Sequence, residues 1–591
     1  MDTMREKIAF LYPKQTGEVY QKLRQILDDF KKISKRTKSF VQGFSEKDVV
    51  LICYPDHVSE ANYHFNNDRG CNGTLGGLHK FLKKYAKGLI NKVHLLPFYP
   101  YSSDDGFSVI DYCQVKKEFG NWEDIREIGN DFGLMFDFVV NHVSSKSEWF
   151  KKFLAGDPKY KDYFIAFDKK VDTSSVYRPR TNSLLTPFKM MDPVAAKTAV
   201  SDKTYAVDEN VTTKKPRRFN VWTTFSEDQI DLNYKNPEVL LEMIKILLFY
   251  VSQGASIIRL DAVRYLWKEL GTSCVDLSQS HMIVKLLRQI LQEVASEVRL
   301  ISEVKGSLDK ALSYFGDGYD ETHLVYNFQL PALLLQAFFK GEATELTKWA
   351  RSLKTASSQT AFFNVAATHD GIGLTPLKGF MSNEEITKLV NYVLEKKGLV
   401  NYHSVGEKLE PYELNIVYLD ALGGAKQFLA SQAIQLSLAG VPGIYFNSLI
   451  GAENWYEGAE KLGNNRVINR EKFNYDKLAK ELESKGSIKN QVYFGFQKLL
   501  RARINEPLFS PLTGQKIVNL NSKIFALLRF NEKEKLLALI NVSSQNVEIE
   551  TDTIVKILEK KKAKDLISGQ EMNLESKNRF IIYPYQSFWL K

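Results

Sequence analysis

The sequence predicts an α/β protein built on a closed (β/α)8 barrel, with a small subdomain inserted after the third strand, an insertion after the seventh strand and a C-terminal antiparallel β domain. Three observations lead to this architecture. Eight short apolar runs recur along the chain, each followed by an amphipathic helical pattern, as in successive parallel βα units. The runs are apolar almost throughout, which is typical of strands buried on both faces. Near residue 515 the pattern changes to the short alternating runs of antiparallel strands.

The elements follow in order from these patterns. Residues 1–45 are charged and helical in pattern, and predict an N-terminal helical extension before a barrel domain of residues 46–514. The strand candidates are, in chain order, 48–55, 92–100, 133–143, 256–262, 299–304, 323–328, 364–370 and 440–448. Residues 515–591 form the predicted C-terminal β domain.

Two connections in the predicted barrel are longer than a single crossover needs. Roughly 110 residues separate the third strand candidate from the fourth, and within them about 144–225 has the pattern of a small subdomain with short strands. A second insertion, about 371–425, follows the seventh strand candidate. Both insertions follow strands, so they extend the loops on the side of the barrel where active sites lie.

Composition narrows the class of protein. The net charge of +10, from 80 basic and 70 acidic residues, is explained by a lysine-rich solvated surface, so neither a nucleic-acid nor a membrane partner is expected. The 4 cysteines form no CxxC pair, which favours a reduced, cytoplasmic protein without structural zinc. No signal-peptide pattern, membrane-length apolar run, glycine-rich dinucleotide motif or metal-ligand cluster is found. We therefore expect no cofactor and no metal.

Charged residues interrupt the fourth strand candidate. Arg259 and Asp261 stand two residues apart in an apolar run, so they share one face of the strand. If that face lines the barrel, Arg259 holds the Asp261 carboxylate ionised, and an ionised carboxylate suits a nucleophile. The alternative is a structural ion pair inside the barrel.

Other strand candidates also end in chemically active side chains: Asp137, Asn141, His142, Glu303, His369 and Asp370. Each acid taken alone could be a helix cap. The carboxyl ends of barrel strands meet at one rim, however, and carboxylates flanking a scissile bond are the arrangement of glycoside chemistry. One acid attacks the anomeric carbon, a second protonates the leaving oxygen, and a third stabilises the transition state.

Four of these segments resemble a known family. DFVVNH, IIRLDAVRY, ISEV and VAATHD resemble, in this order, the four sequence regions of the α-amylase superfamily, glycoside hydrolase family 13. The resemblance covers nearly the whole chain from about residue 48. It implies that Asp261 is the nucleophile, Glu303 the acid/base and Asp370 the transition-state stabiliser.

Longer motifs are similar to the sucrose phosphorylase subfamily, and they span 93–112, 176–188, 260–274, 368–374 and 464–470. Enzymes of this subfamily transfer glucose from an α-glucoside to inorganic phosphate, giving α-glucose 1-phosphate with retention. The resemblance implies a donor site formed by Asp104, Phe107, His142, His369 and Arg466. Without the resemblance, Asp104 and Asp105 are explained equally well by an acidic turn.

The resemblance also implies residues for phosphate and acceptor. An arginine suits phosphate, and family position favours Arg180 over Arg178, although a surface arginine pair at a proline turn is the alternative. Tyr412 and Glu413 occupy the loop that contacts phosphate or acceptor. Sucrose phosphorylases usually carry Gln where this chain has Glu413, and a carboxylate there disfavours phosphate unless a cation neutralises it.

Further segments, 221–240, 313–328 and 411–422, and the N-terminal extension resemble the glucosylglycerate phosphorylase branch, whose acceptor is D-glycerate. Two features depart from that pattern. Arg264 replaces a usually small residue next to Tyr265, and 305–308 replace an Asn-Val-Pro-His-like stretch. Tyr265 and Arg264 are both expected at the substrate. Arg264 either binds an anionic acceptor or pairs with a nearby acid.

The sequence therefore predicts a retaining glucoside phosphorylase that works through a covalent glucosyl-enzyme, with a small glucoside and inorganic phosphate as its partners. The rival is an α-glucosidase or transglucosidase of the same superfamily. A non-catalytic sugar-binding relative is disfavoured because all three acids are present. The oligomeric state stays open between monomer and homodimer.

Overall fold

The structure is a computed structural model that describes residues 3–33, 43–60, 73–190, 218–405, 408–575 and 578–591. Cys71, the end of the predicted N-terminal extension and part of the predicted subdomain lie outside these ranges. Within them, no helix is long and apolar enough to cross a membrane. The same residues contain no group of three or more His, Cys, Asp or Glu placed to hold a metal ion.

Eight strands close into a barrel in which each strand lies beside the barrel strands that precede and follow it in the sequence. They are β1 (Val50–Cys53), β3 (Lys92–Leu95), β4 (Gly133–Val139), β10 (Ala255–Asp261), β11 (Arg299–Ser302), β12 (Leu324–Tyr326), β13 (Ala361–Val365) and β17 (Val441–Tyr445). The last strand pairs in parallel with the first, Val50 opposite Gly443. The predicted barrel is confirmed.

The seventh strand differs from its predicted position. It begins at Ala361 and ends at Val365, whereas the sequence predicts 364–370. Phe362 and Phe363 are buried members of this strand, and the residues from Ala366 to Asp370 form the loop that follows it. This shift places Asp370 in a loop rather than on the strand itself.

Helices follow the strands, and they are, in order, α3 (Thr74–Phe81), α4 (Trp122–Asp131), α7 (Pro237–Ser252), α8 (Ser278–Val294), α9 (Leu308–Ser313), α10 (Leu330–Lys340), α14 (Ala425–Ser437) and α18 (Ile488–Ile504). Local sequence explains where several begin. Asn236 caps α7 by accepting from the Glu238 amide, and Pro237 opens its first turn. Asn121 and Asp124 form a reciprocal capping box at the start of α4.

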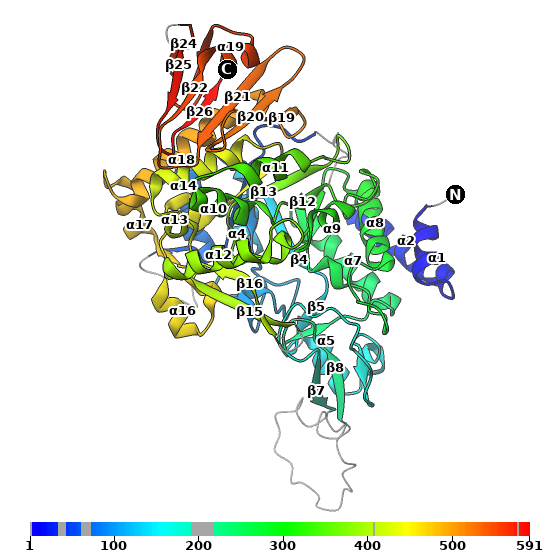
Figure 1. Cartoon of the computed structure of the whole chain (residues 1–591). Helices are drawn as coiled ribbons and strands as arrows, with labels where there is room; N and C mark the ends of the chain where they lie inside the picture. The colour runs from blue at the N-terminus through cyan, green and yellow to red at the C-terminus, as the bar shows by residue number, and fades with distance from the viewer. Residues whose placement is uncertain (1–2, 34–42, 61–72, 191–217, 406–407, 576–577) are drawn as a thin grey trace, which may run out of the picture. The chain divides into compact units, whose positions relative to one another are not determined.

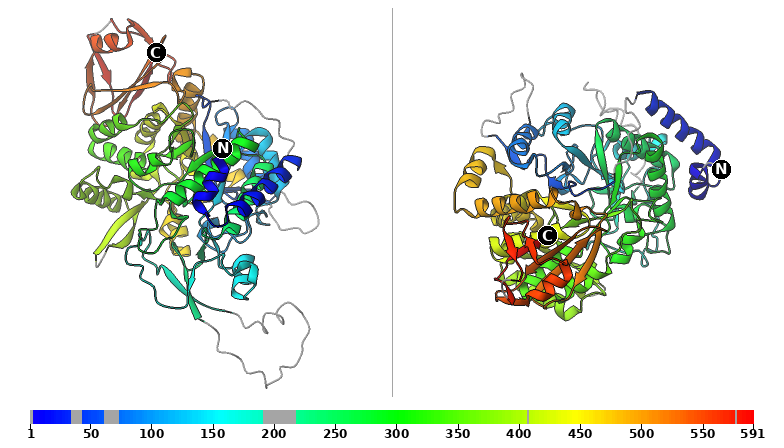
Figure 2. Two further views of the ribbon diagram at one scale, coloured as in Figure 1. Left: turned by 90° about the vertical axis from the view of Figure 1, so that its right-hand side faces the viewer. Right: turned by 90° about the horizontal axis from the view of Figure 1, so that it is seen from above.

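The chain forms two compact units. The first comprises Met1–Ser39, Pro97–Lys117 and Phe136–Val298, and the second comprises Phe40–Leu96, Glu118–Met135 and Arg299–Lys591. In the first unit, helices α1 (Thr3–Leu11) and α2 (Thr16–Ile33) pack on α7 and α8, as Figure 2 shows in blue against green. Helix α2 buries Val19, Leu23, Leu27 and Phe30, which repeat at helical spacing along one face.

The segment after β4 also belongs to the first unit. It contains a three-stranded antiparallel sheet, in the order β6 (Ala166–Phe167), β8 (Arg218–Trp222) and β7 (Leu185–Lys189). A separate pair joins β5 (His142–Ser144) to β9 (Gln229–Asp231), with His142 opposite Asp231. This pair returns the chain to the end of β4 and brings residues 228–231 beside His142.

In the second unit, the chain after β13 forms a three-stranded antiparallel sheet, in the order β14 (Ile372–Gly373), β16 (Lys408–Asn415) and β15 (Leu399–Val405) (Figure 1). Asn401 lies opposite Glu413 in this sheet. Strand β14 pairs with the other edge of β16, with Gly373 opposite Glu413. The sheet therefore holds Glu413 on its central strand.

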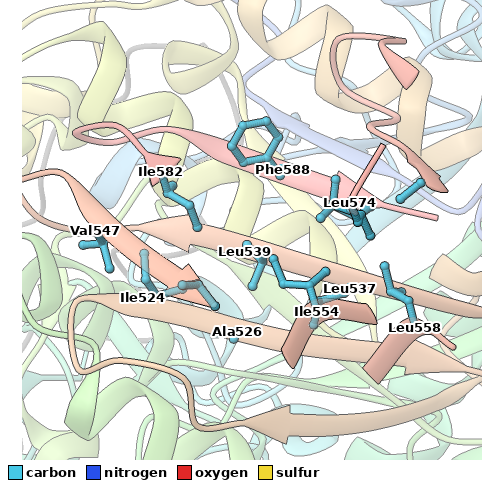
Figure 3. Close-up of a cluster of buried hydrophobic side chains, with 13 residues drawn as sticks. Ile524, Ala526, Leu537, Leu539, Val547, Ile554, Leu558, Leu574, Ile582 and Phe588 are labelled. Atoms are coloured by element: carbon cyan, nitrogen blue, oxygen red, sulfur yellow. The ribbon is translucent and has the colours of Figure 1, made fainter. Parts of the chain in front are cut away.

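The C-terminal domain is built on an antiparallel sheet, in the order β19 (Gly514–Val518), β20 (Ile524–Phe530), β21 (Lys535–Asn541) and β26 (Ser587–Leu590). Alternate residues of β20 and β21, such as Ile524, Leu537 and Leu539, fill a core that Figure 3 shows with Ile582 and Phe588. The predicted antiparallel domain is confirmed. Helix α19 (Thr551–Leu558), which the strand pattern does not predict, packs Ile554 into this core.

Candidate active site

The three acids predicted to perform the chemistry each lie at or beyond the carboxyl end of a barrel strand. Asp261 is the last residue of β10, Glu303 directly follows β11, and Asp370 lies in the loop after β13. Asp261 and Asp370 are 7% and 9% exposed. Active sites of parallel barrels lie at this end of the strands.

In the first unit, Arg259 links two acids on neighbouring barrel strands. Its Nη1 donates to Asp261 Oδ1 at 2.8 Å and also to Asp137 Oδ1. Asp137 on β4 and Arg259 on β10 are both almost completely buried. The fixed positive charge favours the ionised form of Asp261 and orients its carboxylate. The sequence predicts the Arg259–Asp261 pair, and the structure adds Asp137 as a second partner.

The loop with Asp104 and Asp105 has an unusual backbone. Both residues have left-handed φ values, 53° and 48°, which non-glycine residues rarely adopt. The Asp228 carboxylate accepts hydrogen bonds of 2.5–2.8 Å from the hydroxyl groups of Ser102, Ser103, Ser108 and Ser145. Burial raises the pKa of Asp228, but these hydroxyl groups outweigh it, and the pKa is lowered. One ionised side chain thus ties the loop to the segment after β5.

The structure brings together three residues predicted to hold the donor: Asp104, Phe107 and His142. His142 Nε2 donates to the Phe107 carbonyl at 3.0 Å. Gln229 Nε2 donates to Asp104 at 3.2 Å and lies 3.2 Å from His142 Nε2. Burial lowers the pKa of His142, so its ring is neutral at physiological pH. Gln229 was not predicted, because only the β5–β9 pairing brings it to this loop.

A buried charge network supports this region. Lys268 Nζ lies 2.6 Å from Asp231 Oδ2 and donates to Asn141 Oδ1 at 2.6 Å. Asn141 in turn donates to Asp231 at 3.0 Å. Burial lowers the pKa of Lys268. The sequence predicts a site role for Asn141 but not for Lys268 or Asp231, because charged residues outside the barrel strands usually indicate exposed surface.

The side chains expected at the acceptor in this unit have internal partners. Arg264 binds Asp276 through two hydrogen bonds of 2.9 and 2.7 Å, the second of the two alternatives left open by the sequence. The Tyr265 ring lies 5.2 Å from that of Phe225, which lies 5.3 Å from His142. On the inserted loop, Arg178 is exposed and donates to the Thr181 carbonyl, and Arg180 is half-buried.

In the second unit, three cationic side chains and a histidine surround the Asp370 carboxylate. Lys305 Nζ lies at 2.5 Å, Arg466 Nη1 at 2.7 Å, Arg470 Nη2 at 3.6 Å and His369 Nε2 at 3.8 Å. Burial would raise the pKa of Asp370, but Arg466 and Lys305 outweigh it and hold that pKa well below its usual range. Asp370 is therefore ionised at neutral pH, which suits the stabilisation of a developing positive charge.

Glu413 is paired with a cation. Arg466 donates from Nε and Nη2 to its two carboxylate oxygens at 2.8 and 2.6 Å, and Asn401 donates at 3.0 Å. Glu413 is 3% exposed. The carboxylate that would disfavour phosphate if unneutralised is thus neutralised by Arg466. The neighbouring Tyr412 ring stacks on His403 at 5.5 Å between ring centres.

Comparisons with known proteins identify the family to which the chain is similar. Residues 37–395 match the family model described as alpha amylase, catalytic domain, and residues 517–589 match that of the maltogenic amylase C-terminal domain. The glucosylglycerate phosphorylase of Spirochaeta thermophila is 44% identical over 92% of this chain and 89% of its own length. That of Escherichia coli is 40% identical over 98% of this chain and 97% of its own length.

Among solved structures, sucrose 6F-phosphate phosphorylase from Thermoanaerobacter thermosaccharolyticum is similar with a TM-score of 0.70 and 23% identity. The similarity covers 91% of this chain and 98% of that one. At this level of identity the match shows a common fold.

Proposed function

This chain belongs to the α-amylase family, and we propose that it is a retaining glucoside phosphorylase that exchanges inorganic phosphate with D-glycerate on an α-glucosyl unit. The observation that carries the proposal is the set of three acids at the ends of β10, β11 and the loop after β13. Two glucosylglycerate phosphorylases support the choice of reaction, because their sequences are 44% and 40% identical to this one over nearly the whole chain.

The proposed reaction is a double displacement at one rim of the barrel. Asp261 attacks the anomeric carbon while Glu303 protonates the leaving oxygen, and a covalent glucosyl-enzyme forms. Glu303 then removes a proton from the incoming phosphate or glycerate hydroxyl, which attacks the same carbon and releases Asp261. Two inversions give net retention, and Asp370 stabilises the positive charge that develops at each transition state.

The remaining residues have proposed roles in binding. Asp104, Phe107, His142 and His369 hold the glucosyl unit, and Arg466 joins them through its contact with Asp370. Arg259 keeps Asp261 ionised and directed at the substrate. Arg180, Tyr265 and Tyr412 face phosphate or acceptor. The contacts of Glu413 and Arg264 support positioning roles instead, because each forms a two-bond ion pair with a protein partner.

One experiment tests the proposal. The enzyme is given α-glucose 1-phosphate, and phosphate release is measured with glycerate, glycerol, fructose, fructose 6-phosphate, glucose or water alone. Strong release with glycerate is expected. Strong release with another single acceptor would keep the phosphorylase mechanism and change the substrate. Release with water alone would make the enzyme a hydrolase, and no release would make it an inactive relative.

We also propose a cytoplasmic location. The 4 cysteines lie far apart in the chain and form no CxxC pair, a pattern that favours a reducing compartment.

A further inference from the structure

Lys305 contacts two of the three proposed catalytic acids. Its Nζ lies 2.5 Å from Asp370 Oδ2 and 3.4 Å from Glu303 Oε1. The Lys305 side chain is 36% exposed, whereas those of Glu303 and Asp370 are 11% and 8% exposed. Of these three side chains, that of Lys305 is therefore the most exposed, and its ammonium group lies beside the acid that the acceptor must approach.

Asp370 does not depend on Lys305 for its charge partner. Arg466 Nη1 lies 2.7 Å from Asp370 and Arg470 Nη2 lies 3.6 Å away. If Lys305 moved to another anion, Asp370 would still face two guanidinium groups. A flexible lysine stem makes such a movement inexpensive.

The charge balance of the cluster points to an anionic ligand. Lys305, Arg466 and Arg470 are matched by the carboxylates of Asp370, Glu413 and Glu303. The proposed first step needs Glu303 in its protonated form. Protonation of Glu303 leaves the cluster with one unmatched positive charge, which a leaving group that carries a negative charge compensates.

We propose that Lys305 is the residue that selects anionic acceptors, by binding the negative group next to the reacting oxygen. The proposal rests on the phosphorylase function above and adds the residue that recognises the acceptor, a 2-hydroxycarboxylate. In such an acid, the hydroxyl group and the carboxylate are attached to the same carbon. A hydroxyl that donates to Glu303 therefore brings the carboxylate within reach of Lys305 Nζ, 3.4 Å from that acid.

Inorganic phosphate satisfies the same arrangement. Its hydroxyl group donates to Glu303 and attacks the anomeric carbon through its oxygen, while a neighbouring charged oxygen accepts from the ammonium group. A single lysine thus serves both directions of the exchange. Neutral acceptors such as glycerol or fructose offer it no negative group.

The test uses α-glucosyl fluoride as donor. Fluoride has no charged oxygen for Lys305 to bind, whereas a phosphate leaving group has, so the donor step does not depend on Lys305. The wild-type enzyme, Lys305→Met and Lys305→Arg are each offered D-glycerate and glycerol at equal concentration, and the two glucosylated products are quantified by chromatography. Glycerol has the same hydroxyl groups and lacks only the carboxylate. Lys340→Met is the matched control. Lys340 is the last residue of α10, its side chain is 33% exposed, and it binds Glu385 at 2.8 Å.

We expect Lys305→Met to lower the ratio of glycerate to glycerol product by at least about tenfold, since a charged hydrogen bond is lost. Lys305→Arg should keep most of the preference, and Lys340→Met should leave it unchanged. An unaltered ratio in Lys305→Met would overturn the proposal. Loss of fluoride hydrolysis in both Lys305 variants would also overturn it, because transfer to water needs no anion-binding residue.

A parallel reaction with inorganic phosphate separates this inference from the proposed function. If Lys305→Met lowers the ratio of glycerate to glycerol product but the wild-type enzyme forms no α-glucose 1-phosphate from glucosyl fluoride, the phosphorylase function fails and the role of Lys305 stands. If α-glucose 1-phosphate forms and the ratio is insensitive to Lys305, the phosphorylase function stands and the role of Lys305 fails.

Discussion

Arg466 donates two hydrogen bonds of 2.8 and 2.6 Å to the Glu413 carboxylate, and its remaining nitrogen, Nη1, lies 2.7 Å from Asp370 Oδ1. One guanidinium group is thus shared between a residue of the inserted sheet and the carboxylate proposed to stabilise the transition state. Because Arg466 and Glu413 are both buried, this pairing holds the arginine in one orientation. Glu413 acts on the chemistry through Arg466.

Changing Glu413 tests this relationship. Glu413→Ala removes the carboxylate that accepts two hydrogen bonds from Arg466. Removing one partner of a buried pair should reduce the free energy of unfolding by about 3–5 kcal/mol. Glu413→Gln retains one acceptor oxygen and should lose about 1–3 kcal/mol. We expect kcat/KM to fall in the same order, with Ala worse than Gln. Equal activity of Glu413→Ala and wild type would show that Arg466 needs no such support.

The nucleophile assignment is tested by Asp261→Ala. Removal of a nucleophile should lower kcat by at least about 10⁴-fold. Because the small cavity left behind admits an external anion, added azide should restore turnover and yield glucosyl azide. Substantial activity without azide would mean that another group attacks the sugar.

Asp228 is expected to position the donor loop. Asp228→Asn removes the charge that four serine hydroxyl groups share, so the strained turn at Asp104 and Asp105 should loosen. We expect KM for the glucosyl donor to rise about tenfold with a smaller change in kcat. Glu227→Gln, an exposed neighbour, is the matched control. A change confined to kcat would contradict a positioning role.

The same variant has a predicted pH dependence. The pKa of Asp228 is lowered in the fold, where the serine hydroxyl groups outweigh burial. A lowered carboxyl pKa adds stability above the unfolded-state pKa, and this stability is lost as the pH falls through the folded-state pKa. The difference in Tm between wild type and Asp228→Asn should therefore be largest at neutral pH and shrink below about pH 4. A constant difference would contradict the ionised state of Asp228.

Lys268 is expected to matter for stability. Lys268→Met leaves Asp231 without the ammonium group at 2.6 Å, and the loss should be about 3–5 kcal/mol for a pair this deeply buried. Denaturant unfolding measures it. The double variant Lys268→Met/Asp231→Asn should recover part of the loss, because no unpaired charge then remains. Additive losses would show that the two residues do not interact.

Arg264 should behave differently from Lys305. Its guanidinium group is held by both oxygens of Asp276, so Arg264→Gly should weaken transfer to glycerate and to glycerol alike. The competition between glycerate and glycerol for the glucosyl unit of glucosyl fluoride measures both transfer rates. A selective loss of glycerate transfer would return Arg264 to the role of anion binder, the other alternative that the sequence leaves open.

Much of the fold could be predicted because the pattern that specifies it is local. An apolar run followed by an amphipathic helix identifies a βα unit without reference to any distant residue. The position of β13 was wrong for the same reason, since Ala366 and its neighbours continue the apolar pattern after the strand has ended at Val365. The ends of the predicted strands also located Asp261 and Glu303 at the carboxyl rim of the barrel, because a barrel strand and the loop after it are adjacent in the chain.

The partners of these residues could not be predicted in the same way. Asp228 reaches Ser102 from 126 positions away, and Gln229 reaches Asp104 from 125 positions away. No periodicity in the chain records such pairings, because they depend on how the inserted segments return to the barrel. Lys305 and Lys268 belong to short charged segments that are typical of solvated surface, and only the folded structure brings them to their carboxylate partners.

The sequence by itself determined the eight-stranded barrel, the C-terminal antiparallel domain and the positions of the acids along the chain, because apolar runs, continuous in the barrel and alternating in the C-terminal domain, decide which segments become strands. Only the tertiary structure decided which cation neutralises which acid. A pattern in the chain specifies burial and direction for each residue, but an ion pair forms only where folding brings two charges within a few ångströms. The assignment of Arg466 to Glu413, of Arg264 to Asp276 and of Lys305 to Asp370 and Glu303 therefore came from the fold alone.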